Sequence, residues 1–118
     1  MNEHGELIQL DIELLDGYLQ GLGNEVVKKM FTLYQQQVLI YLKDIERSLL
    51  CDNAKLWQEH CHKMKGAAGS VGLIALFERL KLMEKTTEDK KSKTAQLIAL
   101  KIHNEQAIDD FDTWLNSL

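Results

Sequence analysis

The chain has 118 residues, of which 45% are hydrophobic and 27% charged, and its formal net charge at pH 7 is −4. This length and composition fit a single domain over residues 1–118, and the acidic balance argues against nucleic acid as the main partner. The sequence lacks an apolar run near the ~20 residues of a membrane span, and residues 1–4 are too polar for a signal peptide, so we expect a cytoplasmic protein.

The sequence contains no proline, and its apolar residues follow the helical period from the first element onward. Asp11 can cap a short helix that runs to about residue 19, and Gly21 and Gly23 then end it. A long second helix is expected from Asn24 to about residue 50, because apolar residues recur there every three or four positions. These residues form one core-facing stripe: Val27, Phe31, Tyr34, Val38, Leu42, Ile45 and Leu49.

Three more helices are expected, over about residues 54–68, 71–85 and 92–115. Gly69 and Ser70 separate the third helix from the fourth, the polar run 86–91 is predicted as a loop, and the lysine cluster at 90–93 as a solvated turn. Four amphipathic helices joined by short turns bury their stripes together by running antiparallel. The sequence therefore predicts an all-α fold, an up-down-up-down four-helix bundle whose short first helix caps one end.

The third predicted helix turns one histidine toward solvent. At about 100° per residue, His62 lies about 140° from Trp57 and the other apolar side chains of this helix. Gly66 and Gly69 project onto the same outer side, with Lys65 between them and the apolar stripe. Because a glycine inside a helix costs on the order of 1 kcal/mol relative to alanine, two of them around one imidazole indicate that a large partner must approach it.

These residues belong to a longer pattern, His-x-x-Lys-Gly-small-small-x-x-x-Gly. It is filled without a gap by His62, Lys65, Gly66, Ala67, Ala68 and Gly72. The sequence here resembles the histidine-containing phosphotransfer (HPt) domains of multistep two-component phosphorelays, and residues 65–73 are especially similar to the phosphotransfer domain of Arc-type anaerobic sensor kinases. The resemblance extends to the length of the chain, the number of helices and the place of the motif on the third helix.

The resemblance implies that His62 accepts a phosphoryl group from an aspartyl phosphate and returns it to another aspartate. An exposed neutral imidazole can attack phosphorus through Nε2, and the Lys65 ammonium can neutralise the transferring oxygens. Glu84 lies at the border of the apolar face of the fourth helix, and by resemblance it would hold the proton on Nδ1 and leave Nε2 free. The alternative for Glu84 is an ordinary surface pairing with Lys81 or Arg79.

The resemblance also defines the expected partners, which are the receiver domains of response regulators and hybrid sensor kinases. A monomer would bind them transiently through the outer side of the third helix, where Gly66 and Gly69 clear a docking surface, and through adjacent parts of the second and fourth helices. The sequence lacks a Gly-x-x-x-x-Gly-Lys nucleotide loop, so we expect no ATP-dependent kinase activity and a role as a transfer intermediate. We expect no cofactor and no metal site, since Mg²⁺ would be bound in the acidic pocket of the receiver.

Two alternatives stay open at this point. The main one is a non-catalytic four-helix adaptor that binds receiver domains without transfer. The second is a metal- or haem-binding bundle, suggested by His60, Cys61 and His62, although neighbouring positions on a helix point apart. We expect reduced thiols at Cys51 and Cys61. Asn104 is expected to be a buried amide on the apolar seam of the fifth helix. The methionine at the start of the sequence favours a free-standing protein.

Overall fold

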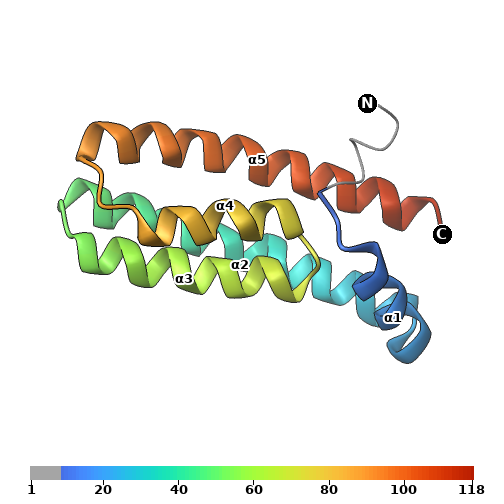
Figure 1. Ribbon diagram of the computed structural model, residues 1–118. Coiled ribbons are helices and arrows are strands. Elements are labelled where there is room, and N and C mark those ends of the chain that lie inside the picture. Colours follow the sequence, from blue (N-terminus) through green and yellow to red (C-terminus); the bar gives the residue numbers. More distant parts are fainter. Residues whose placement is uncertain (1–8) are drawn as a thin grey trace.

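The computed structural model describes residues 9–118, so residues 1–8, with the polar start discussed above, lie outside the description (Figure 1). The described residues form five helices and no strand. The helices are α1 (Ile12–Leu22), α2 (Asn24–Leu50), α3 (Ala54–Ser70), α4 (Ile74–Lys85) and α5 (Lys90–Asn116). None of these helices, within residues 9–118, is both long and apolar enough to cross a membrane.

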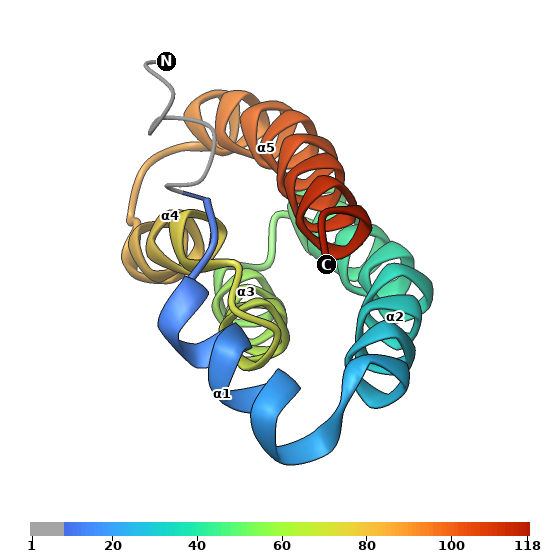
Figure 2. The same cartoon turned by 90° about the vertical axis from the view of Figure 1, so that its right-hand side faces the viewer.

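Helices α2 to α5 form the predicted bundle. Successive helices run in opposite directions along its long axis (Figure 1), and packing of α2 against α3, α3 against α4, α4 against α5 and α5 against α2 closes the bundle. Helix α1 contacts α2 and lies across the end at which the α3–α4 turn is found (Figure 2). The all-α fold with a short N-terminal helix at one end is confirmed.

Aromatic side chains in the core join the four helices of the bundle in two pairs, α2 with α5 and α3 with α4. The rings of Phe31 on α2 and Phe111 on α5 stack with centroids 4.3 Å apart. The indole N–H of Trp57 on α3 donates a hydrogen bond of 2.8 Å to the carbonyl of Met83 near the end of α4. Because each contact joins two different helices, these side chains fix how the helices are placed around the core.

A buried polar contact also joins α2 to α5. Asn104 is 4% exposed, and its Oδ1 accepts a hydrogen bond of 2.7 Å from the hydroxyl of Tyr34. The expected buried amide is therefore confirmed, and its partner is a side chain that the sequence placed in the apolar stripe of α2. A buried pair of this kind is stable because neither polar group is left without a partner.

The predicted boundaries differ from the structure by two residues or more at four helix ends, including the start of α4, which is at Ile74 and not near residue 71. Helix α1 continues to Leu22 and α3 to Ser70, so the separation of α3 from α4 falls at Val71–Leu73. Helix α5 begins at Lys90, because the Asp89 carboxylate accepts the backbone N–H of Ser92 at 2.9 Å and caps the helix. The predicted loop is therefore wrong at residues 90 and 91. The solvated turn predicted at 90–93 is wrong throughout, since these residues are helical and Lys93 is buried. An aspartate before a helix is nevertheless an ordinary N-cap signal.

The α3–α4 turn closes through glycine in a left-handed conformation. Gly72 has a φ of +76°, its N–H donates to the carbonyl of Gly69, and the N–H of Leu73 donates to the carbonyl of Ala68 at 2.9 Å. These two hydrogen bonds are those of a Schellman motif, which requires a residue with positive φ. The Gly72 carbonyl in turn accepts the N–H of Asp11 at 2.7 Å, so the same turn holds the start of α1.

Replacing Gly72 with alanine is expected to lower the free energy of unfolding by about 2 kcal/mol, because a Cβ disfavours the left-handed conformation. That Cβ would also lie 3.0 Å from Cγ of Leu15. Denaturant unfolding measures the change, with Gly17→Ala as the control, since Gly17 lies inside α1 and alanine there should hold or raise stability. Equal stability of Gly72→Ala and the unmodified chain would contradict this account of the turn.

Candidate functional site

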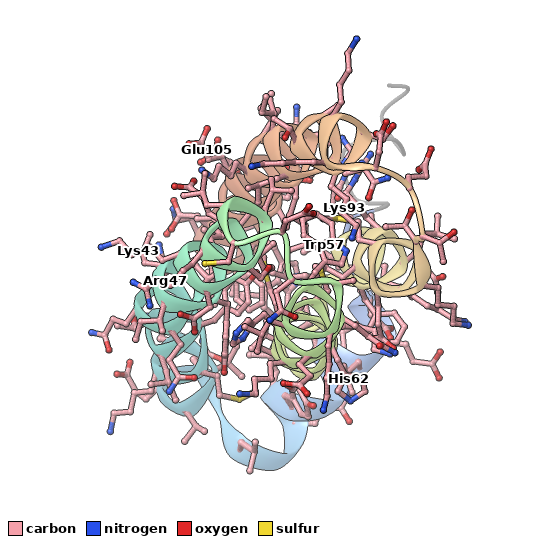
Figure 3. All side chains as sticks on the ribbon, turned by 90° about the vertical axis from the view of Figure 1, so that its left-hand side faces the viewer. Lys43, Arg47, Trp57, His62, Lys93 and Glu105 are labelled. Atoms are coloured by element: carbon pink, nitrogen blue, oxygen red, sulfur yellow. The ribbon has the colours of Figure 1, made fainter. Side chains whose placement is uncertain are left out.

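His62 lies on the outer side of α3, as predicted. Its side chain is 66% exposed, whereas Trp57, Cys61 and Met64 on the same helix are fully buried. Figure 3 shows His62 at the periphery of the molecule and Trp57 in its interior. The helical period therefore identified correctly which side of α3 faces solvent.

Glu84 on α4 reaches across to the imidazole. Its Oε1 lies 3.0 Å from Nδ1 of His62, and the Glu84 side chain is only 13% exposed. An ionised carboxylate can only accept hydrogen bonds, so Nδ1 carries the proton in this contact. The neutral ring then has its lone pair on Nε2, and Nε2 forms no hydrogen bond with the part of the chain described here.

Lys65 shares the same carboxylate oxygen. Its ammonium lies 2.9 Å from Glu84 Oε1 and its side chain is 17% exposed, with Nζ 5.9 Å from the centre of the Phe77 ring. Sequence reasoning placed Lys65 beside the histidine but missed this ion pair. The alternative pairing of Glu84 with Lys81 or Arg79 is not what the structure shows, since Arg79 lies instead 3.4 Å from Nε2 of His103.

The environment of Glu84 keeps its carboxyl ionised. Partial burial by itself would raise the pKa of Glu84, but the hydrogen bonds from Lys65 and His62, together with their charges, outweigh burial and hold that pKa below its ordinary value. Because the pKa of Glu84 is lower in the folded state than in the unfolded state, its ionised carboxylate stabilises the fold at pH values above the ordinary carboxyl pKa. This contribution disappears as the pH falls through the folded-state pKa. At neutral pH the site therefore contains a fixed negative charge beside Nδ1.

Gly66 and Gly69, the two glycines expected on the outer side of α3, differ in the space that surrounds them. Apart from the helix backbone and the two neighbouring residues of α3, no atom among residues 9–118 lies within 4 Å of a Cβ at Gly66, so this position is open. A Cβ at Gly69 would lie 2.9 Å from Cδ1 of Phe77 on α4, closer than such atoms pack. Gly69 was expected, like Gly66, to clear a docking surface, and this contact shows that its missing side chain also allows α3 and α4 to approach each other.

A groove of about 480 Å³ runs between α2 and α3 beside His62. Its lining includes Met30, Leu33 and Val71, and it reaches His62 and Gly66. Leu33, which contributes to this lining, is 53% exposed. The groove was not identified from the sequence, and the one available signal was that Leu33 lies outside the apolar stripe of α2.

The metal-binding alternative has no support in this geometry. Cys61 lies in the core, and burial raises the pKa of its thiol to about 12, so the thiol stays protonated. The described part of the chain contains no group of three or more potential ligands able to hold one metal ion. Cys51 and Cys61 are both free thiols.

Comparisons with known proteins identify relatives of this chain. A family model described as the Hpt domain matches residues 29–114. The aerobic respiration control sensor protein ArcB of Escherichia coli (strain K12) is 36% identical over 64 residues, and the same protein of Shigella flexneri gives the same identity. Each match covers 54% of this chain and 8% of the sensor protein, so the chain corresponds to a small part of those relatives.

Two solved structures share the fold. The histidine-containing phosphotransfer domain of ArcB from Escherichia coli superimposes with a TM-score of 0.85, covering 96% of this chain and 98% of that one, at 23% identity. A solution structure of the phosphotransfer domain of the anaerobic sensor kinase ArcB gives a TM-score of 0.83, covering 98% of this chain and 95% of that one, at 23% identity. The family model spans well over half of the chain, and the chain therefore belongs to the Hpt family, the domains that carry out histidine phosphotransfer in two-component phosphorelays.

Proposed function

We propose that His62 is the residue of this chain that carries the phosphoryl group, and that it does so on Nε2. The observation that supports this assignment is the contact of Nδ1 with Glu84 at 3.0 Å, which leaves Nε2 as the nucleophilic nitrogen of a ring that is 66% exposed. His60 is only 18% exposed and faces Asp44, and His103 is partly buried beside Arg79. Neither offers a comparably accessible nitrogen.

The proposed reaction needs no proton transfer. The Nε2 lone pair attacks the phosphorus of an aspartyl phosphate, the bond between phosphorus and the aspartate oxygen breaks, and its electron pair stays on the departing carboxylate. The ring keeps its proton on Nδ1 and becomes a cation. Glu84 acts as a positioning residue, since its carboxylate holds the proton on Nδ1 and stabilises the charge that develops on the ring.

Hpt domains interact with receiver domains, and we propose that this chain, acting as one monomeric domain, binds them around His62. The α2–α3 groove supplies an apolar surface on one side of the imidazole, and the open position at Gly66 lets the partner approach along α3. A surface of this kind fits a modest and transient interface, as a relay requires, because each receiver must leave before the next one binds.

Incubation of the chain with phosphorylated receiver domains of the source organism tests the proposal. We expect label to move from the receiver to this chain, to be acid-labile and alkali-stable as a phosphohistidine is, and to be located on His62 by peptide mapping. Binding without labelling, with every receiver tested, would support the adaptor alternative instead. Label on His60 or His103 would overturn the assignment of His62.

A further inference from the structure

We infer that Lys65 changes partners during transfer, from the Glu84 carboxylate in the unphosphorylated domain to the phosphoryl oxygens once they are attached to His62. The inference rests on the proposed role of His62. It adds a movement of the Lys65 side chain between the unphosphorylated and the phosphorylated domain. We call this movement the Lys65 exchange.

The first argument is the position of the ammonium. Lys65 Nζ and His62 Nδ1 are both bound to one oxygen, Glu84 Oε1, at 2.9 and 3.0 Å. The ammonium is thus held by the group that binds the Nδ1 edge of the ring. A phosphoryl group on Nε2 would project from the opposite edge of the ring, so Lys65 must leave Glu84 to bind it.

The second argument is a count of charges before and after transfer. In the unphosphorylated site one anion, Glu84, lies against both the Lys65 ammonium and the His62 ring, and the form of the ring that can attack phosphorus is the neutral one. After transfer the ring is a cation and the phosphoryl group is an anion, so the site contains two cations and two anions. If Lys65 stayed on Glu84, two cations would compete for one carboxylate while the phosphoryl oxygens had none. After the exchange each cation has its own anion.

The third argument is that the exchange needs no movement of the helices. Lys65 follows His62 by three positions on α3, a spacing that places two side chains about 5–6 Å apart at Cβ. The lysine stem is flexible and its charge is a compact point. Since 17% of the Lys65 side chain is exposed, the side chain is not enclosed, and rotation about its own bonds can bring the ammonium to the solvent side of the imidazole.

A double-mutant cycle on the transfer equilibrium tests the exchange. The measured quantity is the ratio of phosphoryl groups on His62 to those on a purified receiver domain. We expect Lys65→Gln to shift this ratio about tenfold away from phospho-His62, because one charge-assisted contact with the phosphoryl group is lost. The same substitution should have a larger effect in a Glu84→Gln background, because there Lys65 gives up no ion pair when it moves.

A lysine that never leaves Glu84 gives the opposite result. It would partly cancel the carboxylate charge beside the new cation, so Lys65→Gln in the chain that keeps Glu84 would leave the ratio unchanged or raise it. Either outcome would overturn the exchange. Lys55→Gln is the matched control, since Lys55 is exposed on α3 seven positions before His62 and its loss changes the net charge equally; the ratio should stay constant.

Nuclear magnetic resonance after direct labelling separates this inference from the proposed function. Phosphoramidate can phosphorylate histidine without a receiver, so the state of His62 does not depend on docking. We expect the Lys65 ammonium nitrogen and the Glu84 carboxyl carbon both to shift on labelling, while the Nδ1 proton of His62 stays hydrogen-bonded. Failure of His62 to be labelled would count against the proposed function, whereas labelling that leaves both Lys65 and Glu84 signals unchanged would overturn the exchange alone.

Discussion

Replacing His62 with glutamine is expected to abolish phosphoryl acceptance in a protein that remains folded. The glutamine amide has no nucleophilic nitrogen, so no bond to phosphorus can form. The side chain is 66% exposed, and exposed polar replacements usually change the free energy of unfolding by about 0.5 kcal/mol or less. Transfer of label from a phosphorylated receiver, measured beside a thermal unfolding curve of the same sample, checks both halves of this expectation.

His60 supplies the control for this experiment. It lies two positions away on the same helix, but its side chain is 18% exposed and faces Asp44 on α2. His60→Gln should therefore keep its label, whatever its effect on stability. Full labelling of His62→Gln would show that another residue accepts the phosphoryl group.

Replacing Gly66 with leucine is expected to stop transfer without destabilising the bundle. Apart from the helix backbone and the two neighbouring residues, no described atom lies within 4 Å of a Cβ at this position, and leucine favours a helix over glycine by somewhat under ~1 kcal/mol, so the melting temperature should hold or rise. The new side chain would stand one turn from His62 on the same side of α3. Because a misplacement of even ~1 Å can cost about a hundredfold in rate, transfer should fall by at least that factor.

Gly69→Ala is the informative comparison, because its Cβ would lie 2.9 Å from Phe77. We expect this variant to lose stability, whereas Gly66→Leu should not. Melting curves and transfer time courses of both variants show whether each glycine is needed for the packing of the bundle or for the approach of the receiver to His62. Early melting of Gly66→Leu would assign Gly66 to packing, and normal transfer by a folded Gly66→Leu would remove it from the docking surface.

Features that depend only on neighbouring residues in one helix could be predicted from the sequence. The spacing of apolar residues gave the five helices and the solvent-facing side of α3, since both depend only on a period of 3.6 residues within one helix. The cap at Asp11 was equally local and is confirmed by its hydrogen bond with the N–H of Leu14 at 3.2 Å. The cap at Asp89 was missed, although the same rule for capping residues applied to it.

Contacts between helices were decided by the tertiary structure. The sequence placed Gly66 and Gly69 on one side of α3, but only the position of Phe77 on α4 separates an open glycine from a packed one. The resemblance suggested that Glu84 orients His62, yet the ion pair of Glu84 with Lys65 at 2.9 Å depends on how closely α3 and α4 lie. The groove between α2 and α3 likewise belongs to neither helix alone. Periodicity fixes directions within one helix, whereas distances between helices depend on the packing of the whole core, and the chemistry of this site depends on those distances.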